Sequence, residues 1–129
     1  MRLSRQSGDL RKRGNEFGSV TGRSRRVGWL DLPTLQYSCD ASNITSLIVT
    51  KLDVLDGMDE IKICNKYNKN VFCGNDFEGA IPEYVSLPGW KNRNDPNMKK
   101  YLNYIQDYLQ LPIKYFTCGL DDEKDIVSL

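Results

Sequence analysis

Short apolar runs separated by polar stretches predict a series of strands. The β-branched, nearly continuous apolar run at residues 43–50 predicts a strand that is buried on both faces, as in a parallel sheet. Residues 60–64 alternate like a strand, and residues 113–117 form another apolar run. Residues 81–85 contain a proline and are expected to form an edge strand. Residues 125–129 are expected to add a last short strand.

Two segments between these strands carry helix signals. Asp31 can cap a helix that runs to about Asp40 and that tolerates Pro33 in its first turn. Asp95 and Pro96 begin a second helix, whose apolar residues recur at near-helical spacing and predict a buried face: Met98, Leu102, Ile105 and Leu109. Helices that alternate with buried strands predict an α/β fold, with a mostly parallel sheet and flanking helices.

The length of 129 residues suits one domain with a modest core. Residues 1–13 are polar and basic without a clear period, so they are expected to form a poorly ordered N-terminal segment ahead of a folded part at residues 14–129. The polar stretch from Asn65 to Gly79 predicts a hairpin or an excursion from the sheet. Trp29 and Trp90 each follow a glycine and are expected to be packing residues.

Composition narrows the possible chemistry. The net charge is only +1, yet residues 1–30 hold eight Lys and Arg against two acids, which indicates that this part meets phosphates or carboxylates. The absence of histidine removes the commonest general acid–base near neutral pH and excludes a mixed Cys/His zinc site. The four cysteines form no CxxC pair and indicate free thiols in a reducing cytosol. No apolar run reaches the ~18 residues that a membrane span requires.

Lys51, Leu52 and Asp53 follow the strand expected at residues 43–50, where open α/β sheets bind ligands. A guanine base exposes two adjacent donors, and one carboxylate such as Asp53 can accept both, whereas adenine lacks that edge. The lysine stem can lie along the base or the ribose. The K-x-D spacing therefore indicates a guanine-recognition element, with solvated charges at a strand end as the alternative.

The loop Ser19–Arg26 lies within a glycine-rich stretch at residues 14–28. It combines backbone N–H groups, a hydroxyl and guanidinium groups, which suit an anionic ligand. The alternative is an exposed basic turn, or a non-catalytic anion- or RNA-binding module that uses Arg11–Arg26. Thr117, Cys118 and Gly119 end another expected strand. Gly119 permits close approach of the backbone to a ligand, although an ordinary turn glycine explains it equally well.

A loop of the form G-x-x-x-x-G-K-[ST], which would cradle a triphosphate, does not occur in this sequence. A base-recognition element without a phosphate cradle indicates a site whose other half lies elsewhere.

Four segments resemble adenylosuccinate synthetase, in this order: GNEFGSVTGRSRRVGWLDLPTLQY, SLIVTKLDVLDGMDEIKIC, YVSLPGW and LPIKYFTCGLDD. The resemblance covers about residues 10–120 and corresponds to the C-terminal third of the family, so it implies an incomplete P-loop-NTPase-like fold. It implies a ligase that joins inosine monophosphate (IMP) to L-aspartate while hydrolysing GTP, with Mg²⁺, through a 6-phosphoryl intermediate. It also implies a cytoplasmic homodimer without a membrane or nucleic-acid partner.

The resemblance assigns roles to three groups of residues. The aspartate-binding loop comprises Ser19, Val20, Thr21, Gly22, Arg23, Ser24 and Arg25. Arg23 would also reach the ribose of IMP, and Arg25 would lie near the GTP phosphates. The GTP-binding positions besides Arg25 are Lys51, Leu52, Asp53, Thr117, Cys118 and Gly119.

The sequence departs from the family pattern at Val20, Leu120 and Asp122, which replace a frequent threonine, a proline and a basic residue. The catalytic residues and the metal ligands of the family have no counterpart here, so the chain is expected to be inactive alone. An incomplete sheet is also expected to expose an apolar edge and to make the isolated chain aggregate.

Overall fold

The computed structural model describes residues 11–13, 19–23, 27–71, 74–119 and 126–129. Residues 11–13, in the segment expected to be poorly ordered, are helical. The remaining elements follow in chain order: β1 (Leu30–Asp31), α2 (Leu32–Ala41), β2 (Leu47–Val49), the 3-10 helix η1 (Leu52–Leu55), β3 (Glu60–Tyr67), the 3-10 helix η2 (Gly74–Phe77), β4 (Pro82–Pro88), α3 (Pro96–Leu109), β5 (Ile113–Thr117) and β6 (Ile126–Ser128).

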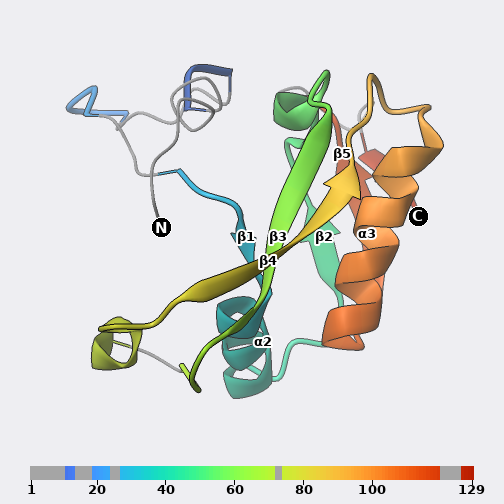
Figure 1. The fold of residues 1–129 in the computed structure, drawn as a ribbon. Coiled ribbons are helices and arrows are strands. Elements are labelled where there is room, and N and C mark those ends of the chain that lie inside the picture. The colour runs from blue at the N-terminus through green and yellow to red at the C-terminus, as the bar shows by residue number, and fades with distance from the viewer. Residues whose placement is uncertain (1–10, 14–18, 24–26, 72–73, 120–125) are drawn as a thin grey trace.

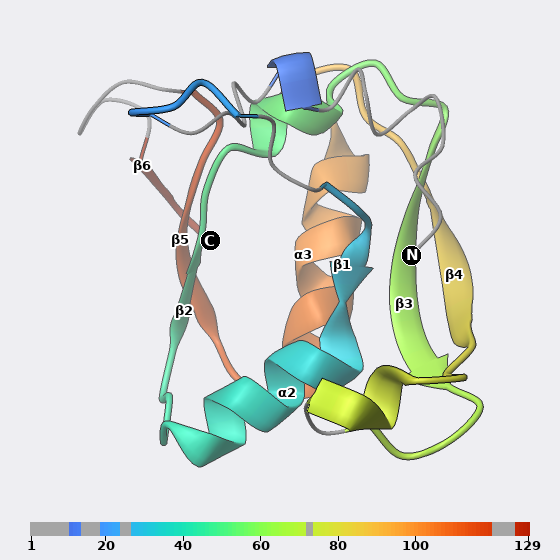
Figure 2. The ribbon, with the colours of Figure 1, turned by 90° about the vertical axis from the view of Figure 1, so that its left-hand side faces the viewer.

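The strands form two three-stranded sheets, in the orders β1-β3-β4 and β2-β5-β6 (Figure 1). In Figure 2, strands β3 and β4 stand on one side of α3, and β2, β5 and β6 stand on the other. Each sheet combines one parallel pair, β1–β3 or β2–β5, with one antiparallel pair, β3–β4 or β5–β6. The predicted α/β class with flanking helices is confirmed. In place of the mostly parallel sheet that was expected, the described strands form two mixed sheets, because β4 and β6 each add to their sheet in the antiparallel direction.

Helix α2 begins where the sequence predicts. The Asp31 side chain accepts a hydrogen bond from the Thr34 amide at 3.1 Å, and Pro33 lies in the first turn, where its missing N–H costs nothing. The second Asp31 oxygen accepts from the Tyr67 hydroxyl, so the same carboxylate ties the start of α2 to the end of β3. Cys39 faces the core from the last turns of this helix.

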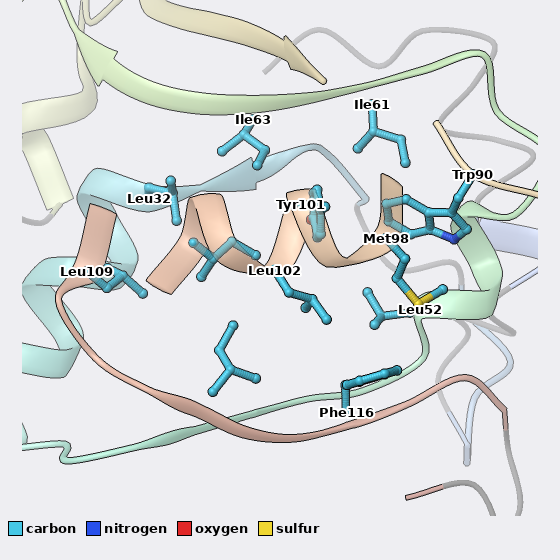
Figure 3. Packing of buried hydrophobic residues seen from close by; sticks show 12 residues of the cluster. Leu32, Leu52, Ile61, Ile63, Trp90, Met98, Tyr101, Leu102, Leu109 and Phe116 are labelled. Atoms are coloured by element: carbon cyan, nitrogen blue, oxygen red, sulfur yellow. The ribbon is translucent and has the colours of Figure 1, made fainter. Parts of the chain in front are cut away.

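Helix α3 supplies the centre of the core. Its predicted apolar stripe is confirmed, because the following side chains are all at most 5% exposed: Met98, Leu102, Ile105 and Leu109. Figure 3 shows Met98, Leu102 and Leu109 of this helix between Ile61 and Ile63 of β3 on one side and Phe116 of β5 on the other. Burying an apolar side chain of this size stabilises a fold by about 1.5–3 kcal/mol. Trp90, predicted to be a packing residue, belongs to the same core and is 1% exposed.

Replacing Asp95 with Ala is expected to destabilise the fold by about 1–2 kcal/mol. Asp95 caps α3: one carboxylate oxygen accepts from the Asn97 amide at 3.0 Å, and the other accepts from the Lys91 amide at 3.2 Å. Asp95→Asn is the matched control because asparagine keeps a capping oxygen. The midpoint of urea-induced unfolding, measured on soluble protein, gives the effect on stability. Equal losses of stability for both variants would contradict a capping role.

The prediction that residues 43–50 form a strand buried on both faces is wrong. Only Leu47–Val49 form a strand, and the Ile48 side chain is 64% exposed. Side chains alternate along a strand, so Leu47 and Val49 pack against the core while Ile48 points away from it. A nearly continuous apolar run indicates burial on both faces only if a second layer covers the sheet, and no such layer covers Ile48 within the described residues.

The stretch that follows Asn65 agrees with the hairpin that was expected there. Strand β3 extends to Tyr67 and pairs with β4 antiparallel, and the excursion between them contains η2. At its base the Asn68 amide donates to the Ile81 carbonyl at 3.0 Å, and the Ile81 amide donates to the Asn68 side chain at 2.8 Å.

The cysteine chemistry also agrees with expectation where it is described. Cys39 and Cys64 are buried free thiols, and burial raises the pKa of both, so they are poor nucleophiles. Cys73 lies outside the described residues. The helices in the described ranges are all too short or too polar to cross a bilayer.

Candidate functional site

Two segments that are far apart in the sequence meet at one edge of the fold. Strands β2 and β5 are parallel neighbours with Val49 opposite Phe116, so the segments that follow them leave the sheet side by side. The Lys51 amide donates a hydrogen bond to the Thr117 hydroxyl oxygen at 3.2 Å. The K-x-D element and the Thr117–Gly119 segment therefore form one candidate site at the carboxyl ends of parallel strands, where α/β sheets bind ligands.

The turn from β2 into η1 is fixed by a buried leucine and a left-handed lysine. Lys51 has φ 58° and ψ 39°, a conformation that costs a residue with a Cβ about 1–2 kcal/mol and that recurs at binding sites. Leu52 is 3% exposed and belongs to the core, whereas Lys51 and Asp53 on either side are half-buried. Burial of the middle residue thus leaves the two charged residues at the surface of the site.

The Asp53 carboxylate has its acceptor positions available. Within the described ranges, no hydrogen bond or ion pair engages this carboxylate. An ionised carboxylate can accept two parallel N–H donors in a bidentate pair. The arrangement therefore suits a ligand that presents two adjacent donors.

Asp56, at the C-terminal end of η1, joins this turn to the core, and no sequence pattern had marked this residue. One Asp56 oxygen accepts from the Trp90 indole N–H at 2.8 Å, and the Gly57 amide donates to the Trp90 carbonyl at 2.8 Å. Arg13 donates from its guanidinium to the Asp56 backbone carbonyl. The only local sequence signal for this turn is its Asp–Gly pair, because Trp90 and Arg13, which hydrogen-bond to it, lie far away in the sequence.

Burial is the largest influence on Asp56 and raises the pKa of its carboxyl group, and the neighbouring charge of Asp53 raises it further. The Trp90 hydrogen bond and the Arg13 charge oppose this shift. A carboxyl whose pKa is higher in the folded state binds more protons there than in the unfolded chain. Folding stability therefore falls as pH rises through the window between the two pKa values, and the ionised form costs stability at neutral pH.

Replacing Asp56 with Asn is expected to raise stability at pH 7 relative to pH 4, because the amide oxygen can still accept from Trp90 without carrying the charge. Asp56→Ala serves as the contrast: it leaves the buried indole N–H without a partner and is expected to cost about 1–3 kcal/mol. Urea midpoints at the two pH values measure both effects. A fall in stability for Asp56→Asn at pH 7 would show that the charge itself holds the turn.

The segment Ser19–Arg23 forms an exposed turn in which Gly22 has φ 67° and the Arg23 amide donates to the Thr21 hydroxyl oxygen at 3.3 Å. Val20 is 95% exposed. In Figure 1 this blue segment lies at the same end of the molecule as η1 but apart from it. None of its hydrogen bonds within the described ranges reaches the two strand ends, and Ser24 and Arg25 lie outside the described residues.

The Thr117–Gly119 segment presents backbone rather than side chains. Thr117 uses its hydroxyl oxygen for the Lys51 amide, and the Cys118 sulfur lies 3.8 Å from the Met98 sulfur and packs against the core. Any contact from Cys118 and Gly119 to a ligand therefore comes from main-chain N–H and C=O groups.

A magnesium site is not formed by the described part of the chain. Its His, Cys, Asp and Glu residues nowhere gather as a group of three or more that could hold a metal ion. The residues that are described do not fit the Mg²⁺ that the resemblance implies, and no chemical step is derived through it.

Fold and site together define an α/β protein whose candidate ligand site lies at the carboxyl ends of parallel strands. Residues 3–126 match the family model of adenylosuccinate synthetase, and the chain belongs to this family.

Individual relatives of this chain are also adenylosuccinate synthetases, and the chain matches each of them over a limited part of its length. The chain is 45% identical over 121 residues to an adenylosuccinate synthetase from Petrotoga mobilis, covering 89% of this chain and 29% of the relative. It is 40% identical over 122 residues to the Thermotoga maritima synthetase, covering 93% of this chain and 30% of the relative. The chain thus spans less than a third of these curated relatives.

A solved structure supports the fold. The fully ligated adenylosuccinate synthetase from Plasmodium falciparum aligns with a TM-score of 0.87 at 30% sequence identity, covering 99% of this chain and 35% of the other. The described fold is therefore close to one part of a larger family member.

Proposed function

We propose that this chain is the C-terminal portion of a GTP-dependent ligase that joins IMP to L-aspartate in purine biosynthesis, and that it supplies guanine recognition and the aspartate loop. The observation that carries the proposal is the hydrogen bond from the Lys51 amide to the Thr117 hydroxyl oxygen, at 3.2 Å. It joins the two segments for which the sequence indicates contacts to one base.

The proposed chemistry of guanine binding follows from the groups at this edge. Asp53 accepts the N1–H and the 2-amino group of guanine in a bidentate pair. The aliphatic stem of Lys51 lies along the base or the ribose. Main-chain groups of Cys118 and Gly119 make further contacts to the base. Guanine is distinguished from adenine because adenine cannot supply two adjacent donors to one carboxylate.

The proposed aspartate site lies in the turn Ser19–Arg23 and continues through Ser24 and Arg25. The Arg23 guanidinium is exposed and can take a carboxylate in fork geometry. We further propose that Arg23 reaches the ribose of IMP and that Arg25 lies near the GTP phosphates.

The chain is proposed to work only as part of a whole synthetase. Its short coverage of the relatives, 29% and 30% of their length, means that most of such an enzyme lies beyond this sequence. Mg²⁺, the phosphate cradle and the catalytic groups would all belong to that remainder. A cytoplasmic homodimer is the proposed assembly of the whole enzyme.

A chimera tests the proposal. This chain replaces the matching segment of the Petrotoga mobilis synthetase, and formation of adenylosuccinate is followed with GTP, IMP and L-aspartate. The chimera is expected to form product, and the 129-residue chain alone is expected to form none. A folded chimera that fails to bind GTP would overturn the proposed guanine site, and turnover by the isolated chain would overturn its dependence on the remainder.

A further inference from the structure

The 3-10 helix η1, which carries Asp53, is held at both of its ends. At its start, the Lys51 amide donates to the Thr117 hydroxyl oxygen at 3.2 Å. Just after its last residue, the Asp56 carboxylate accepts from the Trp90 indole N–H at 2.8 Å, and in Figure 3 the indole nitrogen is turned toward the η1 ribbon. Asp53 lies between these two anchors, so its position is set by bonds that its own side chain does not make.

The turn formed by Gly89 and Trp90 supports the end of η1 at several points. Besides the indole bond, the Trp90 carbonyl accepts from the Gly57 amide at 2.8 Å, and the Gly89 amide donates to the Asp59 carbonyl at 3.0 Å. The two segments also touch directly, because a Cβ on Gly89 would lie 1.6 Å from the Met58 carbonyl oxygen. Residues 56–59 therefore have little freedom to move relative to this turn.

Trp90 is in turn fixed by the core and by α3. Its side chain is 1% exposed, and its ring meets that of Tyr101 edge-on, with centroids 5.2 Å apart. Asn97, in the first turn of α3, donates from its side chain to the Gly89 carbonyl at 2.9 Å. A close-packed side chain of this size keeps one orientation. The indole N–H is therefore a fixed reference point for the Asp56 carboxylate.

Asp56 is coupled to Asp53 through the backbone and through charge. The Asp56 amide donates to the Asp53 carbonyl at 3.1 Å. Residues three positions apart on a 3-10 helix eclipse each other, so the two side chains leave η1 on the same side. The charge of Asp53 accordingly raises the pKa of the Asp56 carboxyl group. A displacement of Asp56 from Trp90 would tilt the Asp53 peptide and turn its carboxylate.

We propose that Asp56 and Trp90 are positioning residues that orient the Asp53 carboxylate and so set the preference for guanine over bases without a 2-amino group. This inference rests on the proposed function, and neither residue would touch the nucleotide. A bidentate pair needs both carboxylate oxygens aligned with both donors, so a tilt weakens it more than it weakens a single hydrogen bond. Inosine triphosphate (ITP) presents only the N1–H and is expected to suffer less from such a tilt than GTP.

Two substitutions in the chimera test this inference. Asp56→Ala removes the acceptor, and Trp90→Phe removes the indole N–H while keeping an aromatic ring in the core. Each is expected to raise the KM for GTP about 10-fold, as the loss of one hydrogen bond implies, and to lower the ratio of kcat/KM for GTP to that for ITP by a similar factor. The KM values for IMP and L-aspartate are expected to change about twofold or less. A purely structural role would lower the amount of active enzyme, and hence the apparent kcat, without moving the nucleotide ratio.

Asp56→Asn is the matched control, because its amide oxygen can still accept from the Trp90 indole. This variant is expected to keep the GTP/ITP ratio within about twofold of that of the unsubstituted chimera. An unchanged ratio in folded Asp56→Ala and Trp90→Phe chimeras would overturn the inference. A loss of preference as large in Asp56→Asn as in Asp56→Ala would also overturn it, because the charge rather than the hydrogen bond would then be responsible.

Hydrogen exchange on the unsubstituted chimera gives a second measurement that needs no variant. Coupling between two sites is reciprocal, so bound GTP must stabilise the contacts that orient Asp53. Saturating GTP is expected to slow exchange of the Gly57 amide, which donates to Trp90, by at least ~10-fold. The Asn68 amide, beyond the other end of β3, is the internal control and is expected to change little. If the substituted chimeras do not fold, an unprotected Gly57 amide in the GTP-bound chimera would still overturn the inference.

Asp53→Asn separates a failure of this inference from a failure of the proposed function. If that substitution leaves the preference between GTP and XTP unchanged, the guanine site itself is wrong. If it alters that preference while Asp56→Ala and Trp90→Phe leave the GTP/ITP ratio unchanged, the guanine site stands and only the positioning role is wrong.

Discussion

Replacing Asp53 with Asn in the chimera is expected to reverse its preference for GTP over XTP. In the proposed site the carboxylate accepts two donors from guanine, whereas an asparagine can accept only one while its amide faces the other donor. Xanthine carries an oxygen in place of the 2-amino group, and the new amide can donate to that oxygen. Sites built around a hydrogen-bonding edge discriminate by up to ~10⁴–10⁵, so a rise of about 10²-fold or more in the KM for GTP is expected.

Asp59→Asn is the matched control for this substitution, because Asp59 is an exposed carboxylate a few residues further along the same segment. It is expected to leave both KM values unchanged. Steady-state rates with each nucleotide at saturating IMP and L-aspartate give the comparison. An unchanged GTP/XTP ratio in a folded Asp53→Asn chimera would remove Asp53 from the guanine site.

Replacing Gly89 with Ala is expected to produce the largest loss of stability, about 3 kcal/mol or more. A Cβ at this position would lie 1.6 Å from the Met58 carbonyl oxygen, a separation that no relaxation of a side chain can relieve. The backbone would have to move, and the hydrogen bond from the Gly89 amide to the Asp59 carbonyl, at 3.0 Å, would be lost. The adjoining bond between Gly57 and Trp90 would be disturbed as well.

Gly57→Ala separates steric overlap from backbone strain in the same region. Gly57 has φ 82° but no atom within 4 Å of an added Cβ, so alanine there meets only the ~1–2 kcal/mol cost of a left-handed conformation. Thermal unfolding of the two chimeras compares the effects. A loss for Gly89→Ala no greater than that for Gly57→Ala would contradict the packing described between residues 58 and 89.

The helices could be predicted from the sequence because their signals are local. Asp31 and Asp95 accept from amides within three residues, and the apolar stripe of α3 is visible at near-helical spacing. Strand β1 could not be predicted, because only two residues form it and its partners, Ile63 and Cys64, lie more than thirty positions away. The exposure of Ile48 escaped prediction for a related reason: burial of the outer face depends on a layer that a local pattern does not encode.

The candidate site, too, could be predicted from the sequence only where its signals are local. The K-x-D element and its position after a strand could be recognised locally, and the structure places it there. The bond from Lys51 to Thr117 spans 66 positions, and the bond from Arg13 to Asp56 spans 43, so neither follows from spacing. The roles assigned to Ser19–Arg25 stay predictions, since Ser24 and Arg25 lie outside the described residues.

The position of Trp90 gives this molecule a built-in optical reporter. The indole donates to Asp56 at the end of η1 and meets the Tyr101 ring edge-on, with ring centroids 5.2 Å apart. Any displacement of η1 by a nucleotide would alter the polarity around the indole and shift its fluorescence emission. The sequence contains only two tryptophans, so Trp29→Phe would leave Trp90 as a single fluorophore that reports on η1, beside the proposed guanine site, without an attached dye.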